Sequence, residues 1–216
     1  MKKIPTLFRR VFDGNRIVGV LPEITEGCEE AFLHGEATLK WDGACCAIIN
    51  GELYKRYDAK NGKPVPEGAI KCQEDHDPIT GHLPCWVKCD RNNPADKWFC
   101  SAYDITYSMI QNRLPNALKD SVRLSDSTYE AVGKHFNGNP YNLKDDFLIQ
   151  HGKKFVEVER TFEGVRKSLK ENNVEGIVFW LDGKPVCKIK RTDFGFAWNG
   201  KGGGKNEIRN IIQRQG

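Results

Sequence analysis

The chain has 216 residues, of which 39% are hydrophobic and 29% charged, a composition that indicates a folded protein and excludes an intrinsically disordered one. Its formal net charge of +4 is modest, because 33 Lys and Arg residues are mixed with 29 Asp and Glu residues, so a polyanionic partner would need a local basic patch. No apolar run is long enough to cross a bilayer and the N-terminus does not read as a secretory signal, which predicts a cytoplasmic protein that binds no membrane.

The eight cysteines follow no regular spacing, which in a chain without a signal predicts free thiols in a reducing compartment. One group, Cys72, His76, His82, Cys85 and Cys89, has spacings that suit a zinc site. The same segment carries the Pro and Gly residues of a loop and lacks a tight Cys-x-x-Cys pair. Zinc and plain loop thiols are therefore both open here, and loop thiols are favoured.

The first clear β pattern begins at Ala37. The runs "ATLKW" and "ACCAII" are short and apolar, and Asn50-Gly51 predicts a tight hairpin turn before "ELYKRY" at 52–57. The aromatic segment "PADKWFCSAYDITYSM" at 94–109 is predicted to be a strand that enters a short helix. "STYEAVG" at 127–133 is predicted to be a short strand that ends at a glycine.

The C-terminal third predicts a helix followed by a second hairpin. Apolar residues at 162, 165 and 169 have helical spacing. "EGIVFW", the turn Asp182-Gly183 and "PVCKIKR" then form a hairpin pattern. The predicted fold class is α+β, with one domain over residues 1–198 and a Gly-rich basic tail over 199–216, where three isoleucines have the spacing of a short packing helix.

Lys40 ends an apolar strand two residues before Asp42-Gly43, where burial of a cation is costly unless the cation has a function. The Asp-Gly pair turns the chain and lets the backbone approach a ligand. Lys188 and Lys190 are two apart on a strand, so both project from one face while the residues between and before them take the other. A solvated ladder of surface charges is the alternative interpretation of this second hairpin.

Five motifs in chain order carry a family resemblance: "KWDG" at 40–43, "YKRYD" at 54–58, "TYEAVG" at 128–133, "EGIVF" at 175–179 and "KIK" at 188–190. They resemble the covalent nucleotidyltransferase superfamily of ATP-dependent DNA and RNA ligases and mRNA capping enzymes. "KWDGACC" and the ending "CKIKRTDFGFAW" are most similar to the branch of small RNA ligases that includes the vertebrate 5′–3′ RNA ligase. The resemblance implies an ATP-grasp-like ligase adenylation domain over 1–198. Since 26 residues follow Lys190 (216 − 190), no OB barrel is expected after it.

The resemblance assigns eight residues to nucleotide binding: Lys40, Asp42, Gly43, Arg56, Glu130, Glu175, Lys188 and Lys190. Lys40 would be the nucleophile that takes AMP from ATP, and Lys188 and Lys190 would act with it by holding the α-phosphate. Glu130 and Glu175 would contact Mg²⁺ or Mn²⁺ through water, with the ribose hydroxyls as the other assignment for Glu130.

Arg56 would contact the ribose or the donor 5′-phosphate. Phe147, Phe155 or the His151-Gly152 position would stack on adenine.

The implied activity is RNA repair by an ATP-dependent RNA ligase, which joins a 5′-phosphate to a 3′-hydroxyl through lysyl-AMP and an adenylated RNA 5′ end. The implied partners are ATP and RNA with these ends, and a monomer is expected. Three other functions are open: a minimal DNA ligase, a capping-type guanylyltransferase, and a non-catalytic nucleic-acid binding module that keeps the fold.

Overall fold

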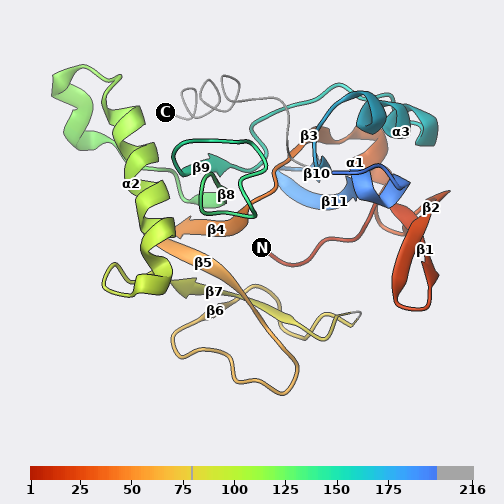
Figure 1. The fold of residues 1–216 in the computed structure, drawn as a ribbon, viewed down its shortest axis with the longest axis horizontal. Helices are drawn as coiled ribbons and strands as arrows, with labels where there is room; N and C mark the ends of the chain where they lie inside the picture. Colours follow the sequence, from red (N-terminus) through yellow and green to blue (C-terminus); the bar gives the residue numbers. More distant parts are fainter. Residues whose placement is uncertain (79, 199–216) are drawn as a thin grey trace. The chain divides into compact units, whose positions relative to one another are not determined.

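The computed structural model describes residues 1–78 and 80–198, and these form two compact units (Figure 1). One unit contains residues 1–3 and 43–151, and the other contains residues 4–42 and 152–198. The chain therefore passes between the units after Asp42, inside the "KWDG" motif. The predicted tail helix in 199–216 lies outside the described residues, and a single adenylation domain over 1–198 stays a prediction.

The unit that contains residues 43–151 is built on a six-stranded antiparallel sheet with strand order β6-β7-β5-β4-β8-β9. Its strands are β4 (Ala44–Ile49), β5 (Glu52–Ala59), β6 (Ile70–Lys71), β7 (Leu83–Lys88), β8 (Ser127–Val132) and β9 (Phe147–Gln150). Its helices are α2 (Lys97–Gln111) and the 3₁₀ turns η1 (Pro94–Asp96) and η2 (Asn116–Ser121). Helix α2 packs along one face of this sheet (Figure 1).

The unit that contains residues 4–42 and 152–198 is built on a three-stranded antiparallel sheet, β11-β10-β3, and a two-stranded hairpin, β1-β2. Its strands are β1 (Phe8–Asp13), β2 (Arg16–Ile24), β3 (Glu36–Lys40), β10 (Gly176–Leu181) and β11 (Lys184–Lys190). Its helices are α1 (Glu29–His34), α3 (Phe162–Glu171) and the 3₁₀ turn η3 (Arg191–Phe194). Residues of α1 and α3 share one apolar core with the three-stranded sheet.

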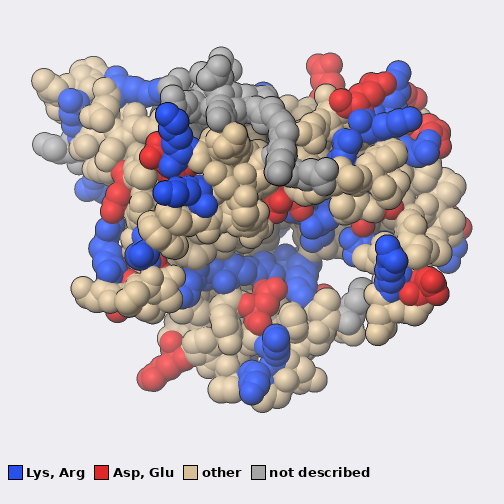
Figure 2. All heavy atoms as spheres, viewed as in Figure 1, with Lys and Arg blue, Asp and Glu red and all other residues tan. Residues whose placement is uncertain are grey.

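The fold is α+β with antiparallel sheets and few helices, as predicted. None of the described sheets closes into a barrel. None of the described helices has the length and apolar character required to span a membrane. On the face shown in Figure 2, both acidic and basic side chains are present, in agreement with the mixed composition.

Both predicted hairpins are confirmed. β4 pairs with β5 across Asn50-Gly51, and β10 pairs with β11 across Asp182-Gly183. All four turn residues have positive φ, from 50° to 75°. Asn, Asp and Gly are the residues that tolerate this left-handed region, so each turn follows from its own two residues.

For 94–109 the predicted helix is present, but the predicted strand before it is absent, so that part of the prediction was wrong. Pro94 begins η1, the side chain of Asn93 accepts a hydrogen bond from the amide of Ala95, and α2 continues to Gln111. The aromatic residues favour a strand by propensity. The helix forms nevertheless because its stripe of small and apolar residues, including Ala102 and Ile110, is buried against the sheet.

Candidate functional site

Three lysines lie on one face of the three-stranded sheet. Gly176 of β10 is paired with Lys40 of β3 on one side and with Lys190 of β11 on the other, and Lys188 lies two residues before Lys190. Side chains alternate along a strand, so all three lysines share a face. On the other face Cys187 and the residue between the lysines are fully buried. The predicted division of this strand into a lysine face and a packing face is confirmed.

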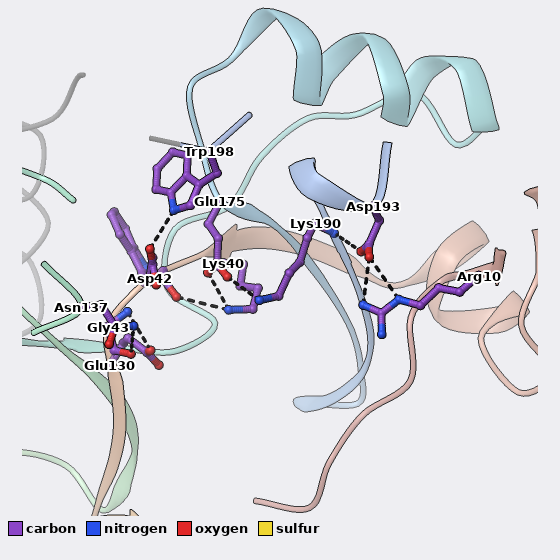
Figure 3. A network of polar contacts seen from close by, with 11 residues as sticks. Arg10, Lys40, Asp42, Gly43, Glu130, Asn137, Glu175, Lys190, Asp193 and Trp198 are labelled. Atoms are coloured by element: carbon purple, nitrogen blue, oxygen red, sulfur yellow. Dashed lines mark hydrogen bonds and ion pairs between the residues drawn. The ribbon is translucent and has the colours of Figure 1, made fainter. Parts of the chain in front are cut away.

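Glu175 joins two of these lysines. Its Oε2 atom lies 2.6 Å from Nζ of Lys40, and its Oε1 atom lies 2.8 Å from Nζ of Lys190 (Figure 3). The Glu175 side chain is 7% exposed, and the lysine side chains are 20% and 34% exposed. A solvated surface ladder would leave these groups open to water, so this arrangement is a half-buried, bridged ion pair instead.

A second carboxylate fixes the end of β11. Asp193 is buried in η3, accepts a hydrogen bond from the backbone amide of Lys190 at 2.8 Å, and pairs with Arg10 of β1 at 2.9 Å (Figure 3). The sequence analysis did not identify Arg10 or Asp193. An Asp three residues after a strand end is a recognisable capping signal, but nothing in the spacing connects it to an arginine in a distant hairpin.

The electrostatics of this cluster of lysines, Arg10 and two carboxylates favour the binding of an anion. Burial, followed by the charges of Lys40, Lys190 and Arg10, lowers the pKa of Lys188 to about 8. Four basic side chains and two carboxylates meet here. Cations that are crowded and partly removed from water gain from a bound phosphate, which supplies the missing negative charge.

Asp42 lies at the end of this unit, and its Oδ2 atom accepts a hydrogen bond from the indole nitrogen of Trp198 at 2.7 Å (Figure 3). Trp41 is 6% exposed, so its indole belongs to the core. Trp198 ends the aromatic stretch that carried part of the family resemblance, but the sequence did not predict its contact with Asp42.

In the other unit, Gly43 is held at both of its backbone polar groups. Its amide donates to Oε1 of Glu130 at 3.1 Å, and its carbonyl accepts from the side chain of Asn137 at 2.6 Å (Figure 3). A Cβ atom at this position would overlap the carbonyl oxygen of Ala131. Glycine is therefore required here by close packing of two strands. The sequence analysis did not identify Asn137.

Glu130 is also held by an imidazole. Nε2 of His151 lies 2.9 Å from Oε2 of Glu130, and Nδ1 of His151 lies 3.0 Å from the hydroxyl of Thr128. Cys45 on β4 is the direct cross-strand partner of Glu130 on β8. Burial and the Glu130 carboxylate raise the pKa of the Cys45 thiol to about 12.

Arg56 lies on β5 of the same sheet. Its Nε donates to Asp58 at 2.8 Å and its Nη1 to the carbonyl of Met1 at 2.7 Å. Tyr54 pairs with Ala47, so by alternation Arg56 and Cys45 lie on one face. Within this unit, Arg56 and Glu130 therefore project from a common sheet face.

Two expectations on accessory residues can be compared with the structure. Phe147 is 3% exposed, so its ring is not available to stack on a base, whereas Phe155 is 56% exposed. Across the described parts of the chain, the only group of three or more metal-ligating side chains with donor atoms within 4.8 Å of one another is Cys45, Glu130 and His151. The thiols and imidazoles of residues 72–89 do not converge in this way.

The eight predicted residues thus fall into two sets, each of which is described by itself. Lys40, Asp42, Glu175, Lys188 and Lys190 belong to the unit with the three-stranded sheet. Gly43, Arg56 and Glu130 belong to the unit with the six-stranded sheet.

A family model for RNA ligase 1 matches residues 55–212, which is most of the chain. The chain belongs to the RNA ligase 1 family. The resemblance to RNA ligases inferred from the sequence is therefore confirmed.

Three individual members of the RNA ligase 1 family share 27–29% sequence identity with this chain over the matched residues. RNA ligase 1 of Rattus norvegicus is 28% identical over 167 residues, which cover 67% of this chain and 47% of the relative. RNA ligase 1 of Pongo abelii is 29% identical over 167 residues, with the same coverage. RNA ligase 1 of Danio rerio is 27% identical over 162 residues, which cover 66% and 46%. The chain spans about half the length of the curated relatives it matches.

Proposed function

We propose that this protein is an ATP-dependent RNA ligase that joins RNA 5′-phosphate and 3′-hydroxyl ends through a lysyl-AMP intermediate. Membership of the RNA ligase 1 family supports RNA as the substrate. The observation that carries the chemistry is the position of Lys40, whose amine is paired with Glu175 in a cluster of basic side chains suited to a phosphate chain.

In the proposed first step, the neutral amine of Lys40 attacks the α-phosphorus of ATP. A nitrogen–phosphorus bond forms, the bond to pyrophosphate breaks, and the amine loses a proton. Glu175 orients the amine, since its Oε2 lies 2.6 Å from Nζ. Lys188 and Lys190 hold the α-phosphate and stabilise the charge that develops on its oxygens.

In the second step the RNA 5′-phosphate attacks this phosphorus and releases Lys40. In the third, a 3′-hydroxyl displaces AMP and seals the strand.

Glu130 and Arg56 are proposed to bind the nucleotide from the six-stranded sheet, with the ribose as the target of Glu130. Gly43 allows the backbone to approach the nucleotide closely. Asn137 and His151 are proposed as positioning residues, because they hold Gly43 and Glu130 through hydrogen bonds of 2.6 and 2.9 Å.

A divalent ion, Mg²⁺ or Mn²⁺, is part of the proposal. Mg²⁺ keeps several waters and binds through few carboxylates together with phosphate oxygens. Both oxygens of Glu175 accept from lysines, so Glu175 fits a contact to metal-bound water and not direct coordination. When bound with ATP, the ion would neutralise the charge of the leaving pyrophosphate.

Covalent labelling tests this proposal. The purified protein is incubated with ATP or GTP and a magnesium salt, and its intact mass is measured. We expect a gain of one adenylyl group from ATP, no gain in Lys40→Ala, and an unchanged gain in Lys184→Ala, an exposed lysine on β11. A gain from GTP only would support a capping-type guanylyltransferase. The absence of any gain would support a non-catalytic binding module.

Substrate class is tested by strand sealing. The 2′-hydroxyl distinguishes RNA from DNA, so a 5′-phosphorylated donor should be joined faster to an acceptor that ends in RNA than to one that ends in DNA. A donor without the 5′-phosphate should not be joined. Equal or faster sealing of an all-DNA junction at the same salt concentration would reassign the protein to the minimal DNA ligases.

A further inference from the structure

Three metal-ligating side chains meet on one face of the six-stranded sheet. Cys45 and Glu130 are direct cross-strand partners on β4 and β8. His151 follows β9, and its backbone amide donates to the carbonyl of Thr128, which extends the pairing of β8 with β9 by one position. Thr128 lies two residues from Glu130, so His151 reaches the same face as the other two side chains. Helix α2 packs on the opposite face, where Cys46 and Tyr129 are buried.

Hydrogen bonds orient the two polar ligands toward a common point. Nδ1 of His151 is engaged by Thr128 at 3.0 Å, which leaves Nε2 directed at Oε2 of Glu130, 2.9 Å away. Oε1 of Glu130 accepts from the amide of Gly43, so Oε2 is the oxygen that faces the imidazole. A hydrogen bond to the second ring nitrogen is the usual means by which a metal-binding histidine is oriented. The Cys45 sulfur lies within 4.8 Å of both.

The donor set selects the class of ion. A thiolate and an imidazole suit zinc, whereas magnesium prefers oxygen ligands alone. A thiolate and a carboxylate carry two negative charges, which a divalent cation balances.

We propose that Cys45, Glu130 and His151 form a three-ligand site for Zn²⁺, with the fourth tetrahedral position open. Zinc would occupy the space between Nε2 and Oε2, while Oε1 stays on the amide of Gly43. This proposal shares Glu130 and His151 with the proposed nucleotide site, so it is tested as metal binding in the absence of nucleotide, and it can fail while the ligase proposal stands. It also differs from the magnesium expected near Glu175 in its ligands and in its ion.

Cobalt provides the test, because Co²⁺ takes the tetrahedral sites of zinc and a thiolate ligand gives it a charge-transfer absorption band. The reduced protein, free of nucleotide, is titrated with Co²⁺. We expect a band that saturates at one equivalent and disappears when Zn²⁺ is added. Cys45→Ser should abolish the band, and His151→Ala and His151→Gln should weaken Co²⁺ binding at least about tenfold. Cys72→Ser and Cys89→Ser should leave the titration unchanged.

Thermal melting without metal is measured for each variant, so that a loss of the band is assigned to the ligand only where the fold is retained. Zinc should raise the melting temperature of the unaltered protein and not that of Cys45→Ser. Absence of a thiolate band in the unaltered protein would overturn the proposal. So would a band that persists in Cys45→Ser, since other thiols would then hold the metal.

Discussion

Neutralising Glu175 should destabilise the protein much more than neutralising an exposed carboxylate does. The Glu175 side chain is 7% exposed and its two oxygens serve Lys40 and Lys190, so Glu175→Gln leaves two half-buried cations without their counter-charge. Loss of one partner of a fully buried ion pair costs about 3–5 kcal/mol, and exposed pairs contribute about 0.2–1 kcal/mol. The lysine side chains are 20% and 34% exposed, so we expect a loss of about 2–3 kcal/mol in the free energy of unfolding.

Equilibrium unfolding in urea measures this change. Glu23→Gln is the matched control, because Glu23 pairs with Arg9 at 2.6 Å but both side chains are more than half exposed, at 56% and 60%. Its loss should stay below about 1 kcal/mol. Adding Lys190→Met to Glu175→Gln should recover part of the loss, since it removes one of the uncompensated cations. Equal losses for Glu175→Gln and Glu23→Gln, or full additivity in the double variant, would refute this account of the cluster.

Further predictions concern the lysine face and the glycine of the first motif. Lys188→Ala and Lys190→Ala should each slow adenylylation about 10²–10³-fold in single-turnover assays and should impair adenylylation more than folding, because the packing residues lie on the opposite face and Glu175 keeps its contact with Lys40; unchanged rates would make them surface lysines. Lys188 has a pKa near 8 when folded and about 10.5 when unfolded, so the unfolded chain binds more protons between these values and stability should rise with pH from about 8 to 10.5. This rise should be smaller in Lys188→Met, and equal slopes in urea unfolding at several pH values would contradict the assignment. Gly43→Ala should destabilise the protein by several kcal/mol, roughly the cost of overpacking a core, because its methyl group would overlap the carbonyl of Ala131. Gly19→Ala, where a Cβ atom meets nothing within 4 Å, should change stability by less than about 0.5 kcal/mol, and similar melting temperatures for the two variants would contradict the packing at Gly43.

Features set by short stretches of sequence could be predicted. The turns at 50–51 and 182–183 form because their residues tolerate positive φ. Helix α3 begins where Thr161 accepts a hydrogen bond from Gly164, and it follows the apolar spacing seen in the sequence. Alternation along a strand then fixes which face Lys188 and Lys190 share. The same reasoning could have found the β1-β2 hairpin, whose two-residue turn is Gly14-Asn15, but the sequence analysis did not predict it.

Where local preference and packing disagreed, packing decided the structure. The aromatic residues of 97–111 favour a strand, yet the segment is helix α2, because a helix places its small and apolar residues against the sheet. Propensity differences amount to a fraction of a kcal/mol per residue, which is less than the gain from burying several side chains.

The polar contacts of the candidate site were decided by tertiary structure alone. The sequence identified five candidate site residues, Lys40, Glu130, Glu175, Lys188 and Lys190. It did not show which acidic side chain pairs with which basic side chain. Glu175 meets Lys40 across 135 positions of the chain, and Arg10 meets Asp193 across 183. Such pairs depend on the register of strands that are distant in sequence, and a shift of one residue would turn every side chain to the other face. The spacing of residues along the chain carries no record of that register, because it is fixed only when the strands pack.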